Sequence, residues 1–433
     1  MDTTPIITQD TIVFGILMLT LGFVFYTSSS ENSAWKKFYK YIPALLMAYM
    51  TPAVFTTFGI ISPEWTTISE TGEVTEHSSQ VYYIASRYLL PAALVLMTLS
   101  IDLKAVFNLG PKALIMFLTG TVGIIIGGPI AILLVSIVSP ETVGGADFDA
   151  VWRGLATLAG SWIGGGANQA AMLEIYNFNT ANYASYVIVD IVVANIWMAI
   201  LLLGIGKSEK IDKWLKADTS AIETLKEKVS SYASQNVRNP SLADFMVILS
   251  IGFVVVGISH LGANAISAFL VENFEAVSDK TSAMSSFGSQ FFWMISIATI
   301  LGIILSFTKL KKYEGAGASK IGSVFIYILV ASIGMKMDLT KILDNPGLLV
   351  VGLIWMATHV LLLIIMAKLI RAPYFFLAIG SKANVGGAAS APVVAAAFHP
   401  SLATVGVLLA VFGYVVGTYG AMLTAELMRI VAP

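Results

Sequence analysis

The sequence predicts an all-α polytopic membrane protein built from two inverted repeats, and three observations lead to this class. The chain has 433 residues, of which 57% are hydrophobic and 12% are charged, whereas a soluble protein is about 25% charged. Its apolar runs are long and continuous, whereas the strands of a membrane β-barrel alternate apolar and polar residues. Two glycine-rich stretches also lie in corresponding places in the two halves, at 160–171 (GSWIGGGANQAA) and 380–391 (GSKANVGGAASA).

Most of the apolar segments approach the length of about 20 residues that a helix needs to cross the hydrocarbon of a bilayer. The N-terminal sequence MDTTPIITQD lacks the basic region of a signal peptide, so we interpret the first segment as a retained span. The predicted spans are 10–27, 41–61, 82–100, 111–138, 183–206, 243–260, 287–306, 320–335, 347–370 and 401–427.

The two halves repeat each other. Residues 99–110 (LSIDLKAVFNLG) and 333–347 (IGMKMDLTKILDNPG) each place an aspartate, Asp102 or Asp338, at the end of a span and then turn into the next span. A glycine-rich stretch and one more span follow in each half. We therefore expect a first repeat at 1–206, a polar cytoplasmic linker at 207–240 and a second repeat at 241–433.

Loop charges indicate that the repeats are inverted, because Lys and Arg favour the cytoplasmic side. The linker carries seven Lys or Arg between Lys207 and Arg238, whereas the loops at 64–76 and 141–149 are acidic. These loops fit a single orientation only if 151–178 enters and leaves on the same face as a re-entrant hairpin. Each half then has five spans plus one hairpin, and both termini lie outside. The alternative is a single unwound crossing helix in each half.

The glycine-rich stretches are the predicted substrate site. Glycine weakens a helix by about 1 kcal/mol relative to alanine, and irregular backbone at membrane depth requires cover by protein or a water-filled cavity. Paired breaks of this kind indicate the binding site of a transporter; the alternative is that the glycines only allow close helix packing. The polar residues among them favour binding. The predicted substrate-binding residues are Ser161, Asn168, Gln169, Ser381, Lys382, Asn384, Gly386 and Gly387.

Asp190 is the predicted ion-coupling residue. It lies near half depth in the span YVIVDIVVANIWMAILL, where an aspartate is costly unless it is protonated, paired or hydrated. The second half has no counterpart, which favours an ion or proton site; the alternative is a hydrogen-bonded structural aspartate. Asn195 and the carbonyl groups freed at Gly164, Gly165 and Gly166 would add neutral oxygen ligands for Na⁺. We expect no other metal.

Three further polar residues lie within the predicted spans or breaks. Lys382 needs an anionic partner, either Asp190 or the substrate, unless it reaches the cytoplasmic surface along its apolar stem. For His359 a hydrogen-bonded packing role is favoured over a proton relay. Arg87 is predicted to reach the outer surface or to pair with a group such as Asp102, away from the site.

Several stretches resemble a known family. ITQDTIVFGILMLTLGFVF, YLLPAALVLMTLSIDLKAV and GSWIGGGANQAA look like the uncharacterised YjcL-like membrane proteins. That family is similar in fold to the cation:proton antiporter and anion transporter superfamily, which includes sodium:bile-acid, sodium:glutamate and 2-hydroxycarboxylate symporters. The resemblance implies glycine motifs at the tips of two re-entrant hairpins, here Gly164–Gly166 and Gly386–Gly387. It implies no substrate, and the single mid-span acid departs from the antiporters that use two aspartates.

The function predicted from these features is secondary active transport of a small organic solute, an organic anion or a short peptide, coupled to Na⁺ or H⁺. The alternatives are a cation/proton antiporter and, from another class, a passive channel or structural membrane protein. We expect no enzyme activity and no cofactor, because no phosphate-binding loop, nucleophile elbow or zinc-ligand spacing occurs. The net charge of −1 predicts no nucleic-acid partner. The expected location is the inner cell membrane, and a homodimer is left open.

Overall fold

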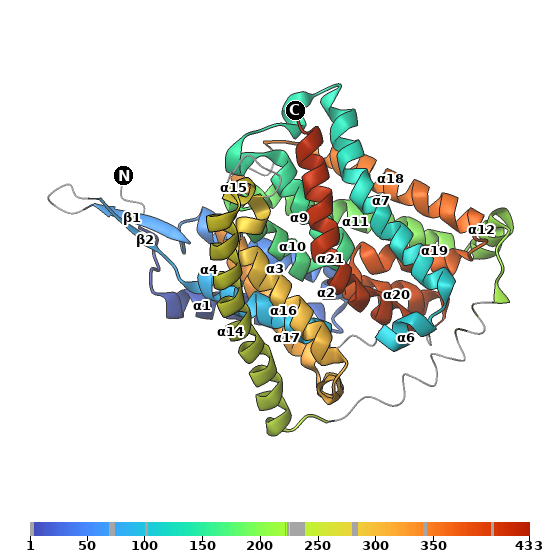
Figure 1. Cartoon of the computed structure of the whole chain (residues 1–433), viewed down its shortest axis with the longest axis horizontal. Helices are drawn as coiled ribbons and strands as arrows, with labels where there is room; N and C mark the ends of the chain where they lie inside the picture. Colours follow the sequence, from blue (N-terminus) through green and yellow to red (C-terminus); the bar gives the residue numbers. More distant parts are fainter. Residues whose placement is uncertain are drawn as a thin grey trace.

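The computed structural model describes residues 4–68, 74–99, 103–220, 222, 225, 239–278, 285–340, 344–399 and 402–433. In this part of the chain the fold is all-α apart from one pair of short strands, as predicted (Figure 1). Eight helices of the described chain are long and apolar enough to cross a membrane. They are α1 (Asp10–Ser28), α4–α5 (Val81–Leu99, with a π-helical turn at Ala85–Leu89), α7 (Pro111–Ser136), α11 (Tyr183–Ile205), α14 (Leu242–Asn273), α17 (Ala318–Lys336), α18 (Leu348–Leu369) and α21 (Ala403–Val431).

Two more apolar helices complete the predicted spans. The helix α16 (Gln290–Ser306) is followed by a 3-10 helix at Lys309–Ala316, and the two are bent by 97°. The helix α3 (Ala44–Thr57) is shorter, with 14 residues and Pro52 inside it. The remaining helices are α2 (Ser33–Tyr41), α6 (Leu103–Asn108), α8 (Pro140–Val143), α9 (Val151–Gly164), α10 (Gly166–Ile175), α12 (Ser208–Leu215), α15 (Glu275–Ser278), α19 (Tyr374–Asn384) and α20 (Gly387–Phe398).

Two features differ from the sequence prediction. The acidic loop contains an antiparallel hairpin of β1 (Glu64–Ile68) and β2 (Val74–Ser78), in which Glu64 pairs with Ser78. It extends away from the helices at the left of Figure 1. Valine, isoleucine and threonine favour such strands, but the loop's glutamates suggested only an exposed connection. The helix α14 also continues to Asn273, well past residue 260, because LGANAISAFLVEN contains no proline and its apolar residues continue on the helix.

The helices form two bundles that pack mainly within themselves. The flanking bundle consists of α1, α3, α5, α14, α16 and α17, and the hairpin bundle consists of α7, α9–α11 and α18–α21 (Figure 1). Each bundle takes equivalent helices from both halves of the chain. The boundary predicted between 206 and 241 therefore separates repeats in sequence, whereas packing interleaves them.

The start of the linker lies against the hairpin bundle. Lys112 at the start of α7 forms an ion pair of 2.9 Å with Asp218, whose backbone N–H donates to the carbonyl of Arg371. Hydrogen bonds from Ser220 and the ammonium of Lys112 lower the pKa of Asp218 to about 2. We call the end of the hairpin bundle at which Lys112 and Arg371 lie its basic end. The rest of the predicted linker, apart from Ile222, Leu225 and residues 239–240, lies outside the described residues.

Candidate functional site at two helical hairpins

The first glycine-rich stretch forms the tip of a hairpin, not a single crossing helix. Trp152 at the start of α9 and Tyr176 just after α10 have ring centroids 5.3 Å apart. Between the two legs, a Cβ on Gly160 would lie 2.6 Å from the carbonyl oxygen of Asn168. In a continuous helix these two residues would be about 12 Å apart along the axis, at 1.5 Å per residue. The chain therefore reverses at Gly165, where φ is +78°.

The second stretch makes an equivalent hairpin. Phe375 near the start of α19 and Phe398 at the end of α20 have ring centroids 5.3 Å apart. The reversal occurs at Gly386 and Gly387, where φ is +110° and +53°. Glycine adopts these positive φ values without the steric cost that a Cβ imposes.

The two hairpins enter from opposite ends of α21, which confirms the inverted arrangement. The open end of the first lies beside the C-terminal part of α21, where the Tyr176 hydroxyl donates to the carbonyl of Met422 at 3.3 Å. The open end of the second leads directly into the start of α21, because α20 ends at Phe398 and α21 begins at Ala403. The second hairpin thus opens at the basic end, and the first opens at the other.

The tips meet halfway along α21. A Cβ on Gly387 would lie 4.0 Å from the Cα of Gly165, so the two breaks face each other as predicted. A Cβ on Gly413 would lie 2.8 Å from the carbonyl oxygen of Ile163 and 3.6 Å from that of Ala383, one from each hairpin. On the other side, a Cβ on Gly166 would meet Ile326 of the flanking bundle at 3.7 Å. The breaks therefore lie at the boundary between the bundles.

Asp190 is bound by the first hairpin. Its carboxylate accepts hydrogen bonds from Ser161 Oγ at 2.7 Å, Trp162 Nε1 at 2.6 Å and Gln169 Nε2 at 3.1 Å, and the residue is 6% exposed. Hydrogen bonds to a charged acceptor are stronger than those between neutral groups. The structure thus brings three of the predicted residues together, and Trp162 is a donor that the sequence prediction missed.

Lys382 is buried, with 2% of its surface exposed, so it does not extend to the cytoplasmic surface. Its ammonium donates to the carbonyl of Ala194 on α11 at 3.2 Å and is not in an ion pair with Asp190. The position of a Cβ on Gly386 is 3.1 Å from the ammonium and 2.2 Å from Ser390 Oγ. Among the described residues, Ser390 Oγ has no hydrogen-bond partner. An ammonium and an unpaired hydroxyl therefore meet at the exposed backbone of Gly386.

Ser381 joins the second hairpin to three helices. His359 Nδ1 lies 2.9 Å from the carbonyl of Gly120, which only accepts, so this nitrogen carries the proton. His359 Nε2 then accepts from Ser381 Oγ at 2.8 Å, and Ser381 Oγ accepts from Trp197 Nε1 at 2.7 Å. Both ring nitrogens of His359 are thus engaged in fixed contacts, as expected for a packing role.

The two asparagines hold the tips in place. Asn384 Nδ2 donates to the carbonyls of Phe117 and Gly380, each at 2.9 Å, and its Oδ1 accepts from Thr121 at 2.8 Å. Asn168 contacts Thr418 on α21. The backbone N–H of Thr418 can only donate, so the amide oxygen of Asn168 faces it at 2.7 Å and the amide nitrogen donates to the carbonyl of Gly164 at 2.9 Å. These amides have their partners within the protein.

Two predicted placements are corrected. Asn195 is exposed and donates to the carbonyl of Ile191 in its own helix at 2.8 Å, so the structure does not bring it to Asp190. At five residues' separation on a helix, the two side chains point in different directions. Arg87 does not simply reach the surface, because it forms a 2.6 Å ion pair with Glu174 at the end of the first hairpin. Asp102, its suggested partner type, lies outside the described residues.

The Arg87–Glu174 pair connects the two bundles beside a polar cavity of about 630 Å³. Tyr82 also donates to Glu174, and the Lys336 ammonium lies 4.5 Å from the ring centroid of Tyr82. Sequence reasoning did not select Glu174, because it lies where the hairpin approaches a loop and resembles an ordinary surface acid. Its role appears only when the flanking bundle is placed against the hairpin.

The fold and the site together define a multi-pass, all-α membrane protein with two oppositely entering hairpins. The profile of the family described as "Protein of unknown function (DUF819)" matches residues 15–431, so the chain belongs to this family. The chain is also 24% identical over 390 residues to "Uncharacterized membrane protein YjcL" of Bacillus subtilis (strain 168), a match that covers 87% of this chain and 88% of that protein.

Proposed function

We propose that this protein is a secondary active transporter that moves a small organic anion, coupled to Na⁺ or H⁺, through a site at the two hairpin tips. The observation that carries the proposal is the meeting of Gly165 and Gly387 halfway along α21, at the boundary between two separately packed bundles. Broken helices from inverted repeats that converge in mid-membrane are typical of transporter binding sites.

The chemistry of the tips favours an anion. The helices α10 and α20 both begin at the meeting point, and helix N-termini carry partial positive charge. The buried ammonium of Lys382 adds a full charge, and Ser390 Oγ offers an unused hydrogen bond. A carboxylate of a small solute would satisfy all three groups.

Asp190 is the proposed coupling residue. It lies on α11, and its three donors come from both legs of the first hairpin, namely Ser161, Trp162 and Gln169. Binding of Na⁺ or a proton at this carboxylate would change the hydrogen bonds that hold the hairpin. Ion binding would thereby influence the adjacent solute site. A cation/proton antiporter is the second candidate, favoured if ions bind at Asp190 and no organic solute binds.

The proposal is tested by thermal unfolding of the purified protein with a panel of monocarboxylates, dicarboxylates, amino acids and short peptides, in Na⁺ or K⁺ buffer. A ligand that binds only the folded state raises the unfolding temperature. We expect stabilisation by an organic anion that is larger in Na⁺ or at a pH that protonates Asp190. Stabilisation by cations alone would favour the antiporter, and passive ion conductance through proteoliposomes would contradict a transporter.

Lys382→Ala tests the anion site with the solute found in that panel. Removing one partner of a buried charge pair costs several kcal/mol, so affinity should fall by far more than tenfold, a factor that needs about 1.4 kcal/mol. Lys382→Arg should not restore it, because a planar guanidinium differs from a compact ammonium. The control is Lys320→Ala, an exposed lysine of α17. Unchanged affinity in Lys382→Ala would contradict the site.

A further inference from the structure

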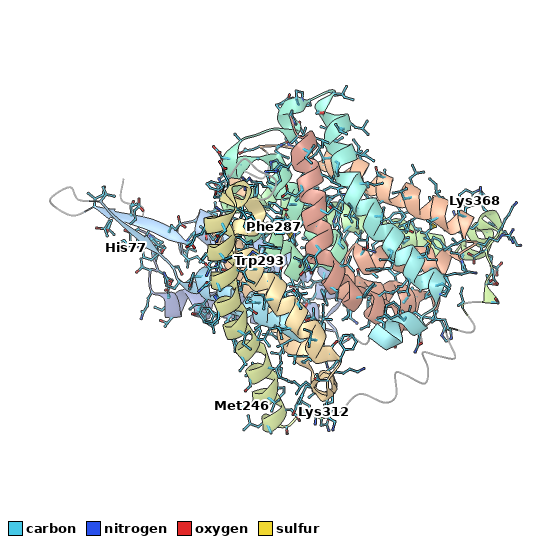
Figure 2. The ribbon with its side chains drawn as sticks, in the orientation of Figure 1. His77, Met246, Phe287, Trp293, Lys312 and Lys368 are labelled. Atoms are coloured by element: carbon cyan, nitrogen blue, oxygen red, sulfur yellow. The ribbon has the colours of Figure 1, made fainter. Side chains whose placement is uncertain are left out.

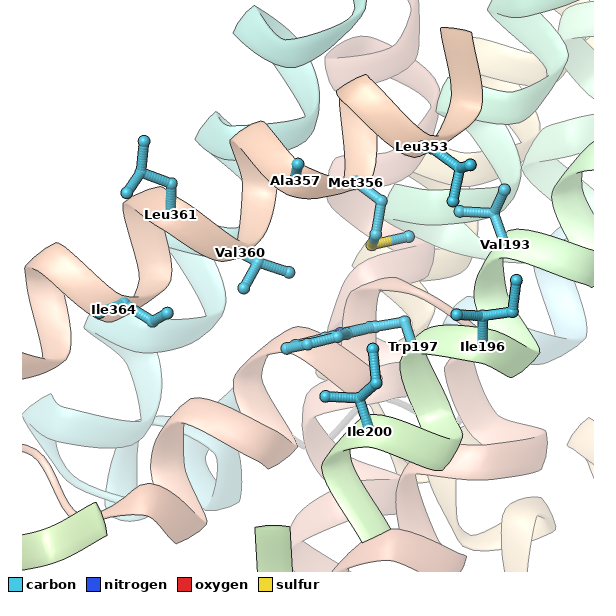
Figure 3. A pocket seen from close by; sticks show the side chains of 10 residues that line it. All are labelled: Val193, Ile196, Trp197, Ile200, Leu353, Met356, Ala357, Val360, Leu361 and Ile364. Carbon is cyan, nitrogen blue, oxygen red and sulfur yellow. The ribbon is translucent and has the colours of Figure 1, made fainter. Parts of the chain in front are cut away.

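A second hollow lies away from the hairpin tips, on the surface of the hairpin bundle. It is a groove of about 390 Å³ between α11 and α18, and all ten side chains that line it are apolar (Figure 3). Val193 and Leu353 lie at one end, Ile364 lies at the other, and Ile200 lies below Trp197 (Figure 3). The ring of Trp197 lies across the space between the two helices (Figure 3).

The groove has the length of one leaflet of a bilayer. On α18 its lining extends from Leu353 to Ile364, which is about 16 Å at 1.5 Å per residue. One half of the hydrocarbon core is about 15 Å thick. Because α11 and α18 are both candidate membrane spans and the lining residues Ile200, Leu353 and Leu361 are exposed, hydrocarbon would cover this surface in a bilayer.

The groove points toward lysines at the basic end. Val360, Ile364 and Lys368 follow one another at four-residue spacing, so they lie along one stripe of α18. Lys207 lies just beyond the end of α11 at Ile205, about one and a half helical turns past Ile200, and precedes α12. Both lysines are exposed. Figure 2 shows Lys368 at the far end of α18.

The short helix α12 indicates that the basic end lies at the membrane surface. Its Trp214 is 54% exposed, and the Lys368 ammonium lies 4.7 Å from the Trp214 ring centroid. Tryptophan gathers at the boundary between hydrocarbon and headgroups. The apolar groove, which has the length of one leaflet, thus ends near two exposed lysines, Lys207 and Lys368, and an interfacial tryptophan.

We propose that the groove binds one acyl chain of an anionic phospholipid from this leaflet, with the headgroup phosphate at Lys207 and Lys368. Basic residues beside membrane helices attract anionic lipids by about 1 kcal/mol each, or about fivefold in affinity per lysine. The lipid would contact Trp197, whose indole N–H donates to Ser381 of the second hairpin at 2.7 Å. Lipid occupancy therefore stabilises the position of that hairpin.

The test is native mass spectrometry of the full chain titrated with dioleoylphosphatidylglycerol or dioleoylphosphatidylcholine, which share acyl chains and differ in headgroup charge. We expect one tightly retained phosphatidylglycerol per chain and weaker binding of phosphatidylcholine. Lys368→Gln should lower phosphatidylglycerol affinity about fivefold and phosphatidylcholine affinity much less, because the choline cation already offsets the charge of its phosphate. Val360→Trp should fill the groove and weaken both lipids more than tenfold.

Two matched variants control for general effects. Ile365→Trp places the same bulk on an exposed position of α18 outside the groove, and Lys312→Gln removes an exposed lysine from the flanking bundle. Neither should change the retained lipid. Equal affinity for the two lipids, or full retention in Val360→Trp, would overturn the proposal. A dimer that Val360→Trp converts to monomer would also overturn it, because the groove would then be a subunit interface.

Discussion

At the scale of single residues, the acid and the base of the site belong to different local networks. Asp190 is held by donors of the first hairpin, whereas Lys382 donates to the backbone of α11. Asp190 belongs to α11 and is bound by the first hairpin, whereas Lys382 of the second hairpin contacts the same helix at Ala194. An ion bound at one residue and a solute bound at the other would therefore affect each other through α11 and the tips.

Asp190→Asn is expected to abolish the ion dependence of solute binding while the protein still folds. The amide keeps the volume of the side chain but removes its charge, and its nitrogen cannot accept from Ser161 or Trp162. Loss of hydrogen bonds to a charged group costs about 1.5–3 kcal/mol each, so the unfolding temperature should also fall. The measurement is thermal unfolding with and without Na⁺ and across pH. A variant that retains the wild-type ion response would refute this role.

The sequence predicted part of this site and missed the rest for physical reasons. Charged and polar side chains cost free energy in hydrocarbon, so their presence within apolar segments indicates a specific role. This cost is why the sequence predicted Asp190, Lys382 and Gln169. Trp162 and Trp197 donate hydrogen bonds at the same site, but a tryptophan in an apolar run looks like packing. Asn195 was predicted as a neighbour of Asp190 in the same span, but five residues on a helix turn its side chain away from Asp190, and it donates within its own helix.

At the scale of elements, close backbone approach fixes the hairpin tips. A Cβ on Gly164 would lie 2.5 Å from the amide carbon Cγ of Asn168 and 2.8 Å from the Cα of Gly417. Either neighbour must move to admit a methyl group, and the second is backbone. The glycines therefore have a packing role as well as a role in the reversal, so the two interpretations of the stretch both hold at different positions.

Gly164→Ala should destabilise the protein by about 1–3 kcal/mol, the usual cost of overpacking. Gly257→Ala is the matched control, because a Cβ there meets nothing within 4 Å and the position lies inside α14. Alanine favours a helix by about 1 kcal/mol over glycine, so the control should be neutral or stabilised. Chemical or thermal unfolding in detergent measures both. Equal effects of the two substitutions would contradict the close approach at the tip.

The hairpin form also fixes which loops share a face. The backbone N–H of Asn179 donates to the carbonyl of Phe148 at 3.0 Å, so the segments before and after the first hairpin lie together. Single cysteines at Glu141 and Asn179, in a chain without native cysteine, should react with an impermeant maleimide from the same side of the membrane. Cysteines in the linker, such as Lys210→Cys, should react from the other side. Labelling of Glu141 and Asn179 positions from opposite sides would exclude the hairpin.

Element lengths alone did not decide between a hairpin and a crossing helix. The residues 151–178 are long enough for one span or for two short legs, and only the contacts between legs, such as Trp152 with Tyr176, distinguish them. Loop charges favoured the hairpin because they constrain the whole chain. The pair of β-strands was not predicted, because the loop was interpreted from its glutamates as an exposed connection and its β-branched residues were not considered.

At the scale of the whole molecule, the two bundles contact each other sparsely and meet at the hairpin tips. The Arg87–Glu174 ion pair crosses this boundary at the end where the first hairpin opens. Interleaving of the two halves places equivalent helices in the same bundle, which follows from the inverted repeats and was not apparent from the sequence order. Movement of one bundle against the other would expose the tips to either side in turn.

The most direct test of the account is the accessibility of Ser390, which lies beside Gly386 and Lys382 at the second tip. In a Ser390→Cys variant the introduced cysteine is the only thiol, because the chain has no native cysteine. The variant is reconstituted in oriented proteoliposomes, and impermeant maleimide is added on one side. A site that opens alternately should be labelled from each side, with the balance shifted by Na⁺, pH or the bound solute, and with no steady ion leak. Labelling from one side under every condition, or a continuous leak of ions, would contradict a site that opens alternately.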